Sequence, residues 1–77
     1  MKTYKVIIGC ITEGHIGHVS FNGIETITYD SSNGYCTIQN DEMLTAKIPL
    51  SQHLYLHGKN NASIDGRYIV SIEVREE

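Results

Sequence analysis

The four histidines are the residues of this chain whose type and spacing come closest to a chemical site. His15 and His18 lie three residues apart beside a turn, where two imidazoles could chelate one metal ion. His53 and His57 lie four apart, a spacing that suits joint ligation on a helix. On a strand, at about 3.3 Å per residue, their Cα atoms would be about 13 Å apart. A histidine-cluster metal protein therefore stays an open alternative, while surface or interface histidines are favoured and no metal or cofactor is predicted.

The other reactive side chains lack the context that catalysis needs. Cys10 and Cys36 fall on apolar faces of expected strands, so we predict buried, reduced thiols. There is no Cys-x-x-Cys spacing, and no base is placed beside either sulfur. The serines lack a nucleophile-elbow motif, and the carboxylates fall at turns or on polar faces. The sequence therefore predicts a protein that is not an enzyme.

The size and charge of the chain limit what can position any site. Its 77 residues allow a single domain, whose core would supply only a few kcal/mol. Six Lys and Arg against nine Asp and Glu give a net charge of −3. No apolar run approaches the roughly 20 residues of a membrane span. The apolar run at residues 6–11 is too short for a signal peptide, so we expect a first strand and a cytoplasmic protein without membrane contact.

The composition favours strands. Ile, Val and Thr account for 21 residues and Tyr for five more, whereas Ala occurs only twice. Glycine-containing turns punctuate the chain at hairpin-like intervals. We predict an all-β domain: a small antiparallel meander of about seven short strands, closing into a barrel of SH3 or OB size or forming a small two-layer sandwich.

The alternation of apolar residues predicts where these strands lie. Residues 3–11 form the first, with apolar side chains on both faces, and residues 15–21 the second, ending at a turn at Asn22-Gly23 with a bulge near Ile24. In a hairpin around residues 31–34, opposed positions sum to 65, which places Ile27 opposite Ile38. The same test around residues 40–42 gives pairs summing to 82, with Ile38 opposite Leu44 and Cys36 opposite Ala46.

The last third of the chain is less regular. Residues 49–58 fit a strand with Leu54 and Leu56 inward, or a short helix, and the strand is favoured. Residues 59–65 are expected to form a polar loop. Residues 67–75 alternate as a final strand that places Tyr68, Val70, Ile72 and Val74 on one face.

A small acidic β-domain with polar outer faces is expected to act by occupying a surface. Tyrosines on such faces are typical of protein interfaces. The leading hypothesis is a protein-binding module or inhibitor, and a homodimer is possible because strand edges favour pairing. The predicted contact patch consists of Tyr35, Tyr55, His53, His57, Asp30, Asp41 and Glu42.

A resemblance supports the leading hypothesis, and one alternative function stays open beside it. In size and composition, and in no motif, the chain resembles the small phage and mobile-element proteins that block host machinery, including anti-CRISPR proteins. The alternative is a small barrel that binds single-stranded nucleic acid. In that case tyrosines would stack on bases and Lys47 or Lys59 would contact phosphates, although the negative net charge supplies little affinity of this kind.

Overall fold

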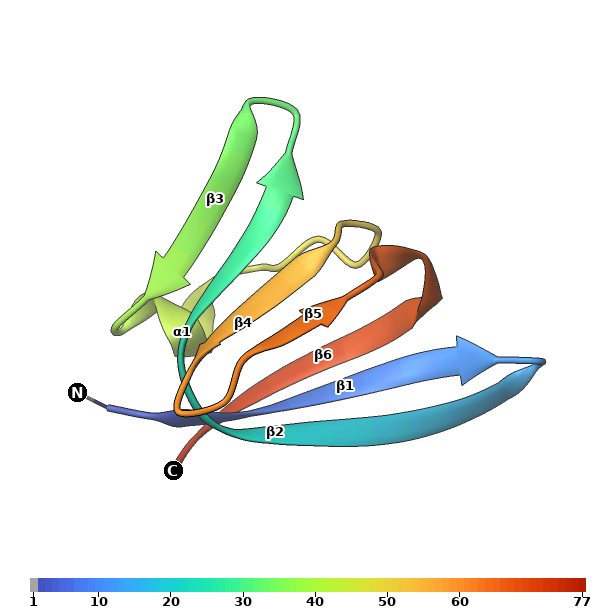
Figure 1. Ribbon diagram of the computed structural model, residues 1–77, viewed down its shortest axis with the longest axis horizontal. Coiled ribbons are helices and arrows are strands. Elements are labelled where there is room, and N and C mark those ends of the chain that lie inside the picture. The colour runs from blue at the N-terminus through green and yellow to red at the C-terminus, as the bar shows by residue number, and fades with distance from the viewer. Residues whose placement is uncertain (1) are drawn as a thin grey trace.

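A computed structural model describes residues 2–77 (Figure 1). Its elements, in chain order, are β1 (Tyr4–Thr12), β2 (His15–Ser31), β3 (Gly34–Gln39), α1 (Glu42–Thr45), β4 (Leu54–Gly58), β5 (Ala62–Ile64), the 3-10 turn η1 (Gly66–Tyr68) and β6 (Ile69–Glu76).

One antiparallel sheet contains all six strands, so the prediction of an all-β fold is confirmed. The strands follow the order β5-β4-β2-β1-β6, and β3 pairs with β2 beside this path. The first half of β2 pairs with β1, and its second half lies between β3 and β4. The sheet is not closed into a barrel, because β5 and β6 at the two ends of the path are not paired with each other.

The bend of β2 divides the sheet into two parts that face each other. The predicted turn at Asn22-Gly23 is wrong, because β2 continues through these residues for 17 residues in all. The predicted bulge near Ile24 is confirmed by register shifts on both sides of β2 at this point. Gly23 has φ +70, a backbone conformation that side-chain-bearing residues rarely adopt, so it allows the strand to bend here. The two strands and the turn predicted on either side of this point are thus replaced by one long, bent strand.

The β2–β3 hairpin has the predicted register. Ile27 lies opposite Ile38 and Tyr29 opposite Cys36, and the pairing continues to Ser31 and Gly34. The hairpin predicted next is wrong, since Glu42–Thr45 form the short helix α1. Met43 is buried, and Leu44, predicted to face inward, is exposed.

The C-terminal strands confirm two expectations and correct one. Leu54 and Leu56 are fully buried on β4, as the strand interpretation predicts. Residues 59–65 are not all loop, because Ala62–Ile64 pair with β4 as β5.

The final strand is confirmed as β6, with one change of face. The β1–β6 register shifts between Gly9 and Cys10, and this shift passes over Val70. Ile69 therefore points inward and is buried, whereas Val70 and Tyr68, predicted to share a face with Ile72 and Val74, are exposed.

The core lies between the two parts of the bent sheet. It contains Tyr4, Val6, Ile8 and Ile69 from one part, and Ile24, Ile27, Ile38, Leu54 and Leu56 from the other, with Met43 of α1. Apolar side chains on both faces of β1 indicate a strand covered on both sides or one that closes a barrel. The structure shows neither, because the second face is half-buried at Ile7 and exposed at Ile11, and the sheet is open. The polar outer faces are the surfaces left for function.

Candidate functional site

The outer face of the β3-β2-β4 part of the sheet gathers the aromatic residues that the sequence singled out. Pairing of β2 with β3 places Asp30 beside Tyr35, and pairing of β2 with β4 places Thr28 beside Tyr55. Side chains of paired residues point to the same face of an antiparallel sheet. Because Ile27, Leu54 and Leu56 point into the core, their neighbours along the strands point outward.

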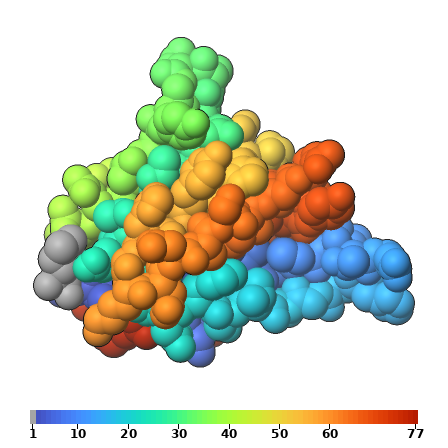
Figure 2. Space-filling view, viewed as in Figure 1, coloured from blue at the N-terminus to red at the C-terminus, as the bar shows by residue number. Residues whose placement is uncertain are grey.

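Three aromatic rings lie next to one another on this face. The ring centroids of Tyr35 and Tyr55 are 6.1 Å apart at 74°, an edge-to-face arrangement. The centroids of His53 and Tyr55 are 4.8 Å apart at 32°. Tyr35 is 74% exposed and stands on the hairpin that projects from the body of the protein (Figures 1 and 2). We call the surface formed by Thr28, Asp30, Tyr35, His53, Tyr55 and Ser63 the tyrosine–histidine face.

A hydrogen bond holds the imidazole of His53 in place. The Nε2 atom of His53 and the Oγ atom of Ser63 are 2.6 Å apart, and the tautomer decides which of them donates. Ser63 lies on β5 and is paired with Tyr55, so the four strands β2, β3, β4 and β5 support the arrangement. The rings are therefore presented in a fixed relation to one another.

The edge of the face carries an ion pair. Asp65 follows β5, and its carboxylate accepts hydrogen bonds from the Nε and Nη2 atoms of Arg67 at 3.0 and 2.6 Å. The guanidinium of Arg67 also lies 5.6 Å from the ring centroid of Tyr68. The pair lowers the pKa of Asp65 from 3.8 to about 2, chiefly through the side-chain hydrogen bonds with Arg67.

Both burial and a neighbouring charge act on the hydroxyl of Tyr55. The pKa of the Tyr55 hydroxyl is raised, first by desolvation, then by the charge of Asp30 and by Tyr35. Tyr35, Tyr55 and Thr28 line an open, mainly apolar hollow of about 300 Å³. Such a hollow can receive a single side chain of a partner molecule.

The structure brings together four of the seven residues predicted for the contact patch and separates the others to different degrees. Asp30, Tyr35, His53 and Tyr55 are neighbours, and His57 lies on the same face beside Thr26. Asp41 and Glu42 begin α1, beyond the end of β3 opposite to Tyr35. The strand from Tyr35 to Gln39 alone spans about 13 Å, at about 3.3 Å per residue, so Asp41 and Glu42 lie at the other end of β3 and are not part of the face.

Sequence reasoning missed Thr28 and Ser63. Thr28 could have been found, because the pairs that sum to 65 also place Asp30 opposite Tyr35 and leave Thr28 on the same side. Ser63 could not, because the strand that contains it has only three residues and no alternating pattern.

The cysteines and the remaining histidines do not form a reactive group. Both cysteines are free, with Cys10 half-buried as a small hydrophobic residue and Cys36 exposed, so the prediction of a buried thiol is wrong for Cys36. His15 and His18 are three residues apart on one strand and point to opposite faces. Among residues 2–77, no three His, Cys, Asp or Glu side chains are placed to hold a metal ion.

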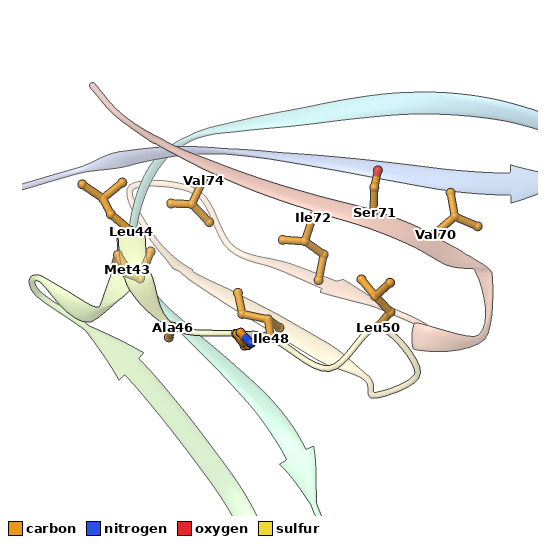
Figure 3. A pocket seen from close by; sticks show the side chains of 10 residues that line it. Met43, Leu44, Ala46, Ile48, Leu50, Val70, Ser71, Ile72 and Val74 are labelled. Atoms are coloured by element: carbon orange, nitrogen blue, oxygen red, sulfur yellow. The ribbon is translucent and has the colours of Figure 1, made fainter.

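A second surface feature is an apolar groove of about 480 Å³ between β6 and the segment that follows α1 (Figure 3). Leu44, Ile48 and Leu50 line one side, and Ile72 and Val74 the other. β6 is the last strand of the sheet path, so its edge beside this groove is not covered by another strand. The groove and the tyrosine–histidine face share no residue.

Comparisons with protein-family models, with curated proteins and with solved structures find no match. In the described part of the chain, the helices are too short and polar to cross a membrane.

Proposed function

We propose that this protein is a non-enzymatic binding module that covers a surface of a protein partner with its tyrosine–histidine face. The observation that carries the proposal is the cluster of Tyr35, Tyr55 and His53, three adjacent rings on an outer sheet face. Tyrosine contributes a large, rigid contact area with a polar tip, which is why it dominates binding energy at protein interfaces. A small domain of this kind would inhibit its partner by covering the partner's functional surface.

The distribution of positive charge favours a protein over a single-stranded nucleic acid. Lys47 lines the apolar groove, and the side chain of Lys59 packs over Gly23 at the bend of β2. Arg67 is bound to Asp65. A nucleic-acid site would need cations following a track beside the rings, and these three serve other contacts.

A capture experiment tests the proposal. Tagged wild-type protein is compared with Tyr35→Ala and Tyr55→Ala in a lysate of the cells that produce it, with and without nuclease. We expect the wild type to capture a protein partner, and this capture to persist after nuclease treatment. Each variant should bind the partner at least tenfold more weakly, because interface tyrosines typically contribute about 2 kcal/mol. Thermal melting of both variants separates loss of binding from loss of fold.

The matched control is Ile16→Ala, which removes a 62% exposed side chain from the β1–β2 hairpin, on the other part of the sheet. It is expected to retain the partner. Equal capture by Tyr35→Ala, Tyr55→Ala and wild type would show that the face is not the binding surface. Material that disappears with nuclease would favour the nucleic-acid alternative.

A further inference from the structure

The carboxylate of Asp30 lies partly covered within the tyrosine–histidine face. Asp30 sits on β2 between Tyr35 of β3 and His53, whose carbonyl oxygen accepts a hydrogen bond from the Asp30 amide at 3.3 Å. Its Oδ1 atom is shielded from solvent and has no hydrogen-bond partner among the described residues. A carboxylate oxygen removed from water normally finds a donor, because leaving it without one costs free energy. The site therefore lacks a positive or N–H-bearing group.

No cationic side chain among residues 2–77 forms an ion pair with Asp30. Within residues 2–77 the ion pairs join Lys2 to Glu76, Arg67 to Asp65 and Arg75 to Glu73. The Nε2 atom of His53 is hydrogen-bonded to Ser63. A donor for Asp30 would then come from a bound molecule.

The two tyrosines make the same position attractive to a cation. Their rings meet edge to face, so the hollow that they line with Thr28 presents a ring face beside a ring edge. Ring faces carry negative potential and attract cations within about 6 Å of the centroid. The charge of Asp30 raises the pKa of the Tyr55 hydroxyl, after the larger effect of desolvation, so the carboxylate acts on the groups that line the hollow.

We propose that the hollow between Tyr35 and Tyr55 binds the guanidinium group of an arginine side chain of the partner protein, with Asp30 as its counter-ion. This proposal rests on the proposed function and specifies what the partner must present. A guanidinium is planar and weakly hydrated, so it stacks on a ring in an open hollow while its edge donates to a carboxylate. The ammonium of lysine holds its water more strongly and has no flat surface to stack on a ring, so it suits this hollow less well. Asp30 is half-buried and is paired with Tyr35, so its side chain points to the same face and lies beside the hollow.

The test is an NMR titration of the ¹⁵N-labelled protein with N-acetyl-arginine methylamide. The citrulline analogue is the matched probe, because its urea group has nearly the same shape and no charge. We expect shifts centred on the amides of Thr28, Asp30, Tyr35 and Tyr55, with arginine binding at least tenfold more tightly than citrulline. Asp30→Asn and Tyr35→Leu should each weaken arginine binding at least fivefold. Glu13→Gln removes the same charge from the distant β1–β2 turn and should change it less than twofold.

The proposal fails if the citrulline analogue or N-acetyl-lysine methylamide binds as tightly as the arginine probe. It also fails if the arginine probe does not bind, if the shifts are centred elsewhere, or if Asp30→Asn leaves arginine binding unchanged. The experiment also separates this proposal from the proposed function. If Asp30→Asn captures the protein partner as wild type does while Tyr35→Ala does not, the binding module stands and the arginine site falls. If the arginine probe binds as expected and no partner is captured, the site stands and the proposed function falls.

Discussion

At Asp65, a carboxylate is held by a residue only two positions further along the chain. The Asp65 Oδ1 atom accepts a hydrogen bond from the Arg67 amide at 3.0 Å, and its Oδ2 atom accepts from the guanidinium. These contacts begin the 3-10 turn η1, which leads the chain from β5 into β6. Hydrogen bonds to the charged form of an acid lower its pKa, because protonation would break them.

We predict that NMR titration of the Asp65 carboxyl gives a pKa near 2 in the wild type, and that Arg67→Gln returns it toward 3.8. Because the pKa is lowered by folding, the contribution to stability is complete above the unfolded value of 3.8. It is then lost as the pH falls through the folded value. Arg75→Gln, which breaks the Glu73 pair instead, should leave the pKa of Asp65 unchanged. An Asp65 pKa that does not respond to Arg67→Gln would contradict this assignment.

At the scale of the strands, a glycine permits a close backbone approach between the bend of β2 and the end of β4. A methyl group on Gly58 would overlap the carbonyl oxygen of Gly23 and crowd the backbone of Ile24 and Glu25. That carbonyl also accepts a hydrogen bond from the Lys59 amide at 2.9 Å. Gly58 is therefore required by space and not by its own backbone conformation.

We predict that Gly58→Ala destabilises the protein by about 1–3 kcal/mol, the usual cost of forcing extra atoms into a packed site. Gly17→Ala is the matched control, because a methyl group there meets nothing within 4 Å. Its effect on the free energy of unfolding in urea should be within about 0.5 kcal/mol. Equal effects of the two substitutions would show that β4 does not approach β2 as described.

The strands also show which parts of the fold were accessible to sequence reasoning. The β2–β3 register was predictable because apolar pairs such as Ile27 and Ile38 alternate with polar ones around a short turn. Alternation failed at Leu44, where the chain turns at Asn40 (φ +55) and buries Met43, which is out of phase with a strand. Part of the tyrosine–histidine face was predictable for the same reason, because the register of this one hairpin places Asp30 beside Tyr35. Tyr55 and His53 depend on β4 pairing with the far edge of β2, and residues 46–53 carry no pattern that specifies this partner.

At the scale of the whole molecule, an open sheet leaves one end of its core uncovered unless another element packs against it. α1 does this with one side chain, because Met43 is 2% exposed and packs with residues from both parts of the sheet. The next residue, Leu44, is 49% exposed and lines the groove. The helix thus covers the end of the core between β3 and β6.

We predict that Met43→Ala lowers the free energy of unfolding by about 2–5 kcal/mol, since it removes buried atoms and leaves a cavity. Leu44→Ala, one residue along the same helix, should lower it by less than about 1 kcal/mol. Urea unfolding followed by circular dichroism measures both. If Leu44→Ala proves the more costly, the inward side of α1 has been assigned wrongly.

The two ends of the described chain lie side by side. The Glu77 amide donates to the Thr3 carbonyl oxygen at 3.2 Å, and Lys2 pairs with Glu76 at 3.1 Å. Figure 1 shows this corner at a distance from the β2–β3 turn, next to which Tyr35 stands. A tag, a fluorophore or a whole second protein attached at either end would consequently leave the molecule at the same corner. The domain can be anchored to a bead or displayed on a carrier by either end, with the tyrosine–histidine face left accessible to a binding partner.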